Sequence, residues 1–114
     1  MKPIYTDFSN VARAIIENNY DDETFGCKEF CHALRMSRSH IHRKLAEEVG
    51  LSISDYIKQI RLAKARELLI QTNYPIYEIA NKVGYSDANY FSRLFSKIYG
   101  IPPSQYRQPL LSTA

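Results

Sequence analysis

An all-α fold is predicted by three features of this 114-residue sequence. Apolar residues recur three and four positions apart along almost the whole chain, which is the spacing of one buried helix face. Serines that can start helices, and glycines and prolines that end them, separate these stretches. A segment of the first half is also repeated in the second half. No stretch shows the strict alternation that is typical of a half-buried strand.

The first half of the chain is expected to hold three short helices. Ser37 is a good N-cap for the third of them, and Gly50 ends it. Apolar residues at helical spacing mark the first helix at Phe8, Val11, Ala12, Ile15 and Ile16, the second at Phe30, Leu34 and Met36, and the third at Ile41, Leu45 and Val49.

A long fourth helix is expected from about Ser52 to Thr72, where Ser52 and Asp55 resemble a capping box. Asn73, Tyr74 and Pro75 break it. Its inner stripe is expected at Ile53, Tyr56, Ile57, Ile60, Ala63 and Leu68, with Lys58, Arg61 and Lys64 beside the stripe.

Two further helices and a final turn are expected in the second half. The fifth helix carries Ile76, Ile79, Ala80 and Val83, and Gly84 turns the chain. Ser86 is expected to cap a sixth helix that runs to about Tyr99 and is ended by Gly100, Pro102 and Pro103. A final turn with Tyr106 is expected to pack back, and residues 109–114 are expected to fray.

The repeat relates the stretch 29–56 to the stretch 78–106, with one residue inserted just after the serine cap. Each copy has a short helix with a small residue at a close crossing (Cys31, Ala80), then a tight turn, then a capped helix with polar residues outside. Arg35 stands at that turn in the first copy, where a positive φ would strain it. A helical-hairpin solenoid is the alternative, but a long helix joins the copies here, whereas solenoid repeats stack in tandem.

The length of the linker helix is consistent with two helix-turn-helix units bound to one DNA duplex. About 20 residues at 1.5 Å each span roughly 30 Å, and successive major-groove faces of B-DNA lie about 34–36 Å apart. We therefore expect residues 1–114 to form one domain, with a first helix-turn-helix at about 26–50, a linker helix at about 52–72 and a second helix-turn-helix at about 76–100.

Charge is distributed unevenly although the net charge is only +3. Residues 17–23 are acidic, whereas residues 35–44 and 56–66, and the chain from Ala88 onward, carry bases and no acid. Such segments suit a polyanionic partner, and solvated helix faces are the alternative. Cys27 and Cys31 stand four positions apart on an expected helix, which does not suit a disulfide, so free thiols in a reducing compartment are expected.

The side chains expected to contact bases lie on the outer faces of the third and sixth helices. Arg43 is suited to guanine O6 and N7, and Asn89 to adenine N6 and N7. The expected base-contacting set is Ser39, His42 and Arg43, then Ala88, Asn89, Ser92 and Arg93, and the expected phosphate-contacting set is Ser37, Arg38, Lys44, Ser86 and Lys97.

Other chemistry has less support in the sequence. Cys27, Cys31, His32, His40 and His42 could be imagined as zinc ligands, but the cysteine spacing is not that of a metal knuckle, so neither a metal nor another cofactor is expected. A module that binds an acidic protein surface is one alternative function. The DNA-targeting part of a repair methyltransferase is another, for which Cys27 is the plausible exposed thiol.

A family resemblance is carried by RLAKARELL at 61–69 and by IYEIANKVGYSDANYFSRLFSKIYGIPPSQYR at 76–107, with MSRSHIHRKL at 36–45 in the first half. The chain resembles the AraC/XylS family of bacterial transcription regulators over about residues 7–107, most closely the versions fused to two-component regulators. The resemblance implies seven helices and the base-contacting positions given above.

The resemblance also implies a function and partners. We expect sequence-specific binding of double-stranded DNA with both recognition helices in successive major grooves, transcription regulation together with RNA polymerase, and no enzyme activity. The domain is expected to be cytoplasmic, without membrane contact, and monomeric, with any dimerisation supplied by another domain. The first copy has the denser basic cluster, so His42 and Arg43 are expected to carry more of the specificity than the second copy.

Overall fold

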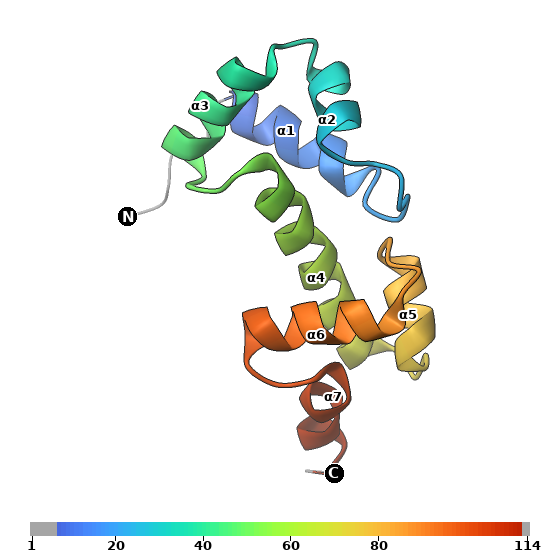
Figure 1. Ribbon diagram of the computed structural model, residues 1–114. Coiled ribbons are helices and arrows are strands. Elements are labelled where there is room, and N and C mark those ends of the chain that lie inside the picture. The colour runs from blue at the N-terminus through green and yellow to red at the C-terminus, as the bar shows by residue number, and fades with distance from the viewer. Residues whose placement is uncertain (1–6, 113–114) are drawn as a thin grey trace. The chain divides into compact units, whose positions relative to one another are not determined.

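The computed structural model describes residues 7–112, and the side chains of residues 7–107 (Figure 1). This part of the chain is all-α, as predicted, and contains no strand. The chain divides into two compact units, Met1–Ile60 and Arg61–Ala114, with the division inside the long helix α4. The helices are α1 (Asp7–Glu17), α2 (Cys27–Leu34), α3 (Arg38–Glu48), α4 (Ile53–Gln71), α5 (Ile76–Lys82), α6 (Ala88–Tyr99) and α7 (Pro103–Ser112).

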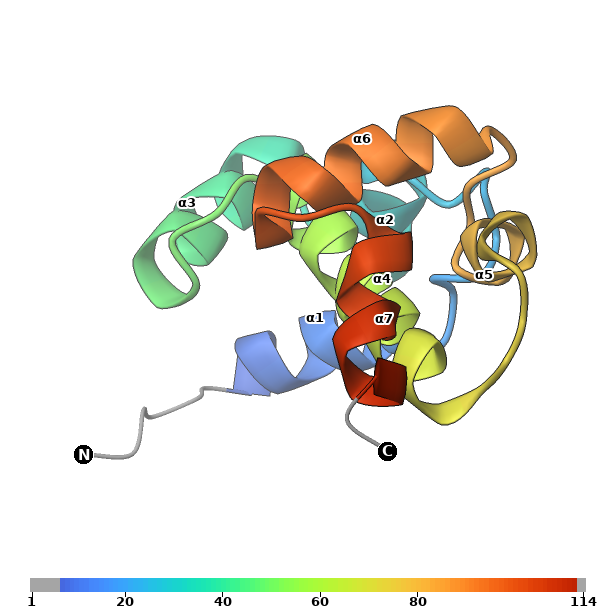
Figure 2. The same ribbon diagram turned by 90° about the horizontal axis from the view of Figure 1, so that it is seen from below.

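The first unit is a three-helix arrangement in which α1 packs against both α2 and α3 (Figures 1 and 2). Its core joins most of the predicted apolar positions to the first turns of α4, because Ile53, Tyr56, Ile57 and Ile60 belong to the same buried cluster. Val11 is the exception in α1, because it is 50% exposed. The Ser9 hydroxyl donates a hydrogen bond to Glu48, which ties α1 to the end of α3. Fully buried core side chains of α1 to α3 are Ala12, Ile16, Phe30, Ile41 and Leu45.

The second unit is built around aromatic rings of α6. Phe95 is fully buried, and its ring centre lies 4.6 Å from that of Tyr99 and 5.6 Å from that of Tyr106. Helix α6 packs against both α5 and α7. The guanidinium of Arg107 ties α7 to the end of α4, because its Nε donates to the carbonyl of Leu69 at 3.1 Å and its Nη1 to that of Tyr74 at 2.6 Å.

The predicted inner stripe of α4 is correct in its first half and wrong in its second. Ala63 and Leu68 are only half-buried, whereas Leu62, Ala65 and Leu69 are buried. With 3.6 residues per turn, this second set lies on a different side of the helix from Ile53, Tyr56, Ile57 and Ile60. One continuous stripe therefore does not describe a helix that contributes to two cores.

Arg61 is also buried, at 8% exposure, although it was predicted to flank the stripe. Its guanidinium lies 5.6 Å from the centre of the Tyr85 ring. An aromatic face stabilises a cation and allows a long charged side chain to be buried along its stem.

The C-terminal segment is more regular than predicted. In place of a single turn at Tyr106 followed by a frayed tail, α7 continues to Ser112. Residues 113 and 114, the end of that predicted tail, lie outside the described residues. Within the part of the chain that the structure describes, no helix is both long and apolar enough to cross a membrane.

Candidate nucleic-acid interface

The first helix-turn-helix consists of α2, a tight turn at Arg35 and α3. Arg35 ends α2 in the left-handed conformation, with φ of 56°, and its N–H donates to the carbonyl of His32 at 3.1 Å. The predicted cap of α3 is confirmed, because the Ser37 hydroxyl accepts from the N–H of His40 at 3.2 Å. The positive φ confirms the predicted strain at this turn, because Arg35 adopts a backbone conformation that disfavours residues other than glycine.

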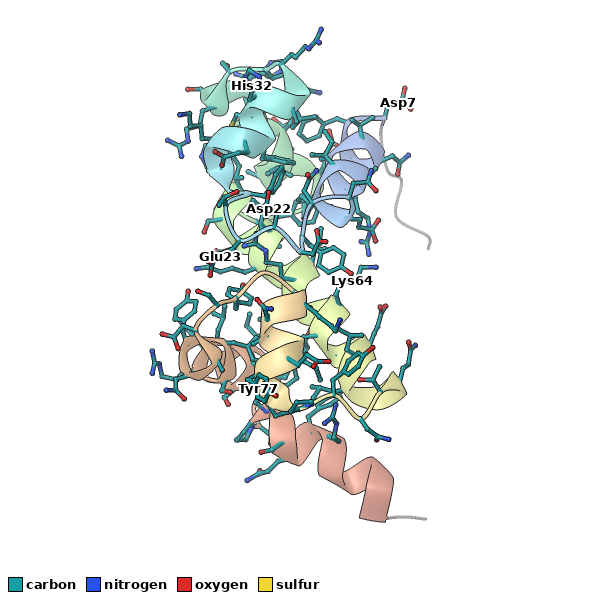
Figure 3. The ribbon with its side chains drawn as sticks, turned by 90° about the vertical axis from the view of Figure 1, so that its right-hand side faces the viewer. Asp7, Asp22, Glu23, His32, Lys64 and Tyr77 are labelled. Atoms are coloured by element: carbon teal, nitrogen blue, oxygen red, sulfur yellow. The ribbon has the colours of Figure 1, made fainter. Side chains whose placement is uncertain are left out.

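The start of α2 is fixed by a carboxylate. Glu29 Oε1 accepts a hydrogen bond from the N–H of Gly26 at 2.9 Å. This backbone hydrogen bond is the largest cause that lowers the pKa of the exposed Glu29 side chain. Figure 3 shows His32 on the same helix, with Asp22 and Glu23 in the preceding loop.

The second helix-turn-helix consists of α5, a turn at Gly84 and α6. Gly84 has φ of 94°, and the small Ala80 is fully buried, as the close crossing requires. The N–H of Tyr85 donates back to the carbonyl of Ala80 at 2.8 Å, which closes the turn. Tyr77 of α5 is 68% exposed and projects from the helix in Figure 3.

The predicted cap of α6 is wrong by one residue. Asp87, and not Ser86, accepts the N–H of Tyr90 at 3.0 Å. Arg35 corresponds to Gly84 and the cap Ser37 corresponds to Asp87, so the inserted residue of the second copy lies before the cap. Serine and aspartate are both strong N-caps, and the longer turn favours the second of two adjacent candidates.

The exposed face of α3 contains all three predicted base-contacting residues. Ser39, His42 and Arg43 are exposed, whereas Ile41 and Leu45 on the other side of the helix are fully buried. Because positions i, i+3 and i+4 are neighbours on a helix, these polar side chains form one surface. This surface can present a guanidinium and an imidazole together to base edges.

The corresponding face of α6 is less fully exposed. Asn89 and Arg93 are exposed, but Ala88 and Ser92 are half-buried. Phe91 and Phe95 occupy the buried side of the helix. The second copy therefore presents two long polar side chains, Asn89 and Arg93, and two short side chains, Ala88 and Ser92.

The predicted phosphate-contacting residues differ in the contacts that their side chains make within the domain. Arg38 donates two hydrogen bonds to the sulfur of Cys27. Lys44 Nζ lies 5.3 Å from the centre of the Phe8 ring, and Ser37 caps α3. Lys97 and Ser86 are exposed. Asp87 was missed by sequence reasoning, and it places a carboxylate at the start of α6, next to the predicted interface.

Both cysteines are free thiols, as predicted. Among the described residues, no group of three or more His, Cys, Asp or Glu side chains is arranged to hold a metal ion.

Comparisons with known proteins agree with this geometry. A family model described as a helix-turn-helix domain matches residues 30–109. The HTH-type transcriptional activator RhaR of Pectobacterium carotovorum is 38% identical over 88 residues, which make up 77% of this chain and 31% of that protein. The chain thus spans about a third of the length of this relative.

Solved structures show the same fold. The C-terminal domain of the two-component response regulator yesN from Fusobacterium nucleatum superposes with a TM-score of 0.83 at 35% identity, over 90% of this chain and 100% of that one. The DNA-binding domain of AdpA, solved in complex with a target DNA, has a TM-score of 0.84 at 19% identity, over 91% of this chain and 93% of that one. The AdpA likeness shows the fold alone.

Two capped helices that follow tight turns, each with an outer polar face, define a DNA-binding domain with paired helix-turn-helix units. The chain belongs to the AraC-type helix-turn-helix family of transcription regulators. This confirms the resemblance found in the sequence, including its likeness to response-regulator fusions.

Proposed function

We propose that this domain recognises a specific double-stranded DNA sequence by placing α3 and α6 in successive major grooves. One observation carries the proposal: in each copy, exposed polar side chains at helical spacing stand opposite a fully buried apolar side. A recognition helix needs this arrangement, because its outer face enters the groove while its inner face stays packed.

Arg43 and Arg93 have the main roles in base recognition. Each is exposed at the corresponding position of its helix and can form a bidentate contact with guanine O6 and N7. His42 donates to an acceptor edge, and Asn89 pairs with adenine N6 and N7. Ser39, Ala88 and Ser92 allow close approach of the helices to the groove.

The phosphate contacts set the register of both helices. They come from the exposed Arg38 and Lys97, from Lys44, from Ser37 at the start of α3, and from Ser86, which lies just before the cap of α6. The domain acts by binding and not by catalysis. It binds as a monomer, and RNA polymerase is the partner through which it alters transcription.

Selection of bound duplexes from a random library tests this function. We expect two short motifs separated by about one helical turn of DNA. Affinity should fall steeply with salt, with a log–log slope near −0.9 for each phosphate contact. Recovery of no motif would contradict sequence-specific reading and would favour a module that binds an acidic protein surface.

A matched pair of arginine variants separates base reading from general charge. Arg43→Ala should relax the motif at one base position. Arg13→Ala removes an equally charged side chain from α1, where Arg13 pairs with Glu17 at 3.6 Å. This control should leave the motif unchanged, and equal changes in the two variants would argue against a base contact by Arg43.

A further inference from the structure

A cluster of two thiols and a guanidinium joins the two helices of the first helix-turn-helix. Cys27 is the first residue of α2, Cys31 follows one turn later, and Arg38 is the first residue of α3. Arg38 Nη2 lies 2.8 Å from Cys27 Sγ, and Arg38 Nε lies 3.2 Å from it. Both cysteines are half-buried, so a small reagent can reach them.

The two thiols are unequal. The Cys27 sulfur is in direct contact with a cationic guanidinium, which is the kind of environment in which reactive cysteines occur. The pKa of the Cys31 thiol is raised, first by burial and then by the neighbouring Cys27. Because the thiolate is the reacting species, a raised pKa slows the reaction of Cys31 at neutral pH.

A disulfide within α2 does not fit this cluster. Cβ atoms one turn apart on a helix are about 5–6 Å apart, whereas a disulfide needs about 3.5–4.5 Å between them. Cys27 and Cys31 can therefore pair only if the first turn of α2 unwinds. The folded domain favours reaction of Cys27 with a small external disulfide.

Arg38 connects this chemistry to DNA binding. The Cys27 sulfur holds two of its donor nitrogens, and the pKa of the guanidinium is raised by these hydrogen bonds. The position of the Arg38 guanidinium thus depends on Cys27 as an acceptor. In the proposed function Arg38 contacts a phosphate, so a change at Cys27 alters that contact.

We propose that Cys27 is a thiol-modification site at which a low-molecular-weight disulfide weakens DNA binding through Arg38. The Cys27 sulfur attacks one sulfur of the reagent, the reagent S–S bond breaks, and a mixed disulfide forms. The leaving thiolate takes up the proton that Cys27 released. The modified sulfur carries an added group where the guanidinium lies, so it no longer holds Arg38 in its present position.

The site is tested first without DNA, which keeps it separate from the proposed function. The full chain is treated with the neutral reagent bis(2-hydroxyethyl) disulfide, and peptide mass mapping follows each cysteine. Cys27 should react at least about tenfold faster than Cys31. Arg38→Ala should slow Cys27 more than Cys31, because the guanidinium hydrogen-bonds to the Cys27 sulfur and acts on Cys31 only as a nearby charge. Equal rates at the two cysteines, or a Cys27 rate that does not respond to Arg38→Ala, would overturn the proposal.

The consequence is tested with a duplex recovered by selection. Modification of the Cys31→Ser variant should weaken binding and reduce the magnitude of the log–log salt slope by about 0.9, as expected for one lost phosphate contact. Dithiothreitol should reverse both changes. The DNA affinity and the salt slope of Cys27→Ser should not change on treatment with the reagent. In Arg38→Ala, modification driven to completion should have no further effect on the slope.

Two further results would separate the regulatory role of Cys27 from the proposed function of the domain. Full modification of Cys27 with unchanged DNA affinity would contradict the regulatory role. Failure of the untreated protein to bind any duplex would contradict the proposed function, and the ratio of cysteine rates would still decide whether Cys27 is the modification site.

Discussion

The two helix-turn-helix units reach similar backbone geometry with different residues. At the turn, Arg35 adopts φ of 56° where the second copy has Gly84 with φ of 94°. The first recognition helix is capped by Ser37 and the second by Asp87. The paired core positions are aliphatic in α3 (Ile41, Leu45) and aromatic in α6 (Phe91, Phe95). The motif therefore needs a left-handed turn, a capped start and a filled core, and several residue types satisfy each need.

The difference in core composition leads to the largest expected effect. Phe95→Ala should lower the free energy of unfolding of the second unit by about 3–5 kcal/mol, because a cavity forms where the Phe95 ring packed against three other rings. Native-state hydrogen exchange measures the result by helix. Amides of α5 and α6 should exchange faster while those of α1 to α3 stay protected. Equal acceleration in both units would mean that the chain unfolds as one unit.

A titration should also distinguish the two turns. Burial raises the pKa of Tyr85 to about 12, whereas the first copy has Met36 at the corresponding position, which does not titrate. The unfolded phenol, with a pKa of about 10, loses its proton first. The stabilisation is therefore complete below pH 10 and is lost as the pH rises toward 12.

Tyr85→Phe should remove this alkaline loss. Between pH 10 and 12 the parent chain should lose up to roughly 2 kcal/mol more stability than the variant. Denaturant unfolding of both chains from pH 8 to 12 measures it. Parallel pH profiles would show that burial of Tyr85 does not govern alkaline stability.

The smallest expected effect concerns the backbone of the two turns. Arg35→Gly should raise the stability of the first unit by about 0.5–1 kcal/mol, because glycine adopts a positive φ without strain and only its greater freedom in the unfolded chain opposes the gain. The reciprocal variant, Gly84→Ala, should lose about 1–2 kcal/mol. Urea midpoints check both. A loss on Arg35→Gly would indicate that the arginine side chain itself stabilises the turn.

The helices and the outer faces of α3 and α6 could be predicted because both follow from local pattern. Periodic apolar residues place the core side, and the positions opposite it must be exposed. Ser37 was recognisable as a cap for the same reason: its hydrogen bond lies within one turn.

Contacts between distant residues could not be predicted in this way. Arg61 has the charge of a surface residue and is buried beside the Tyr85 ring. Arg107 binds carbonyls at the end of α4, and Arg38 binds Cys27 from another helix. Charge patterning indicates where bases occur along the chain, but the packed fold decides what each base contacts.

Paired alanine variants on one selected duplex test the central claim that both recognition helices read DNA and that the first reads more of it. Arg43 and Arg93 are exposed at corresponding positions of α3 and α6. Arg43→Ala should weaken binding by about 1–3 kcal/mol and relax one base position. Arg93→Ala should have a smaller effect of the same kind. An equal or reversed order would contradict the unequal roles, and no loss in either variant would contradict base reading by these helices.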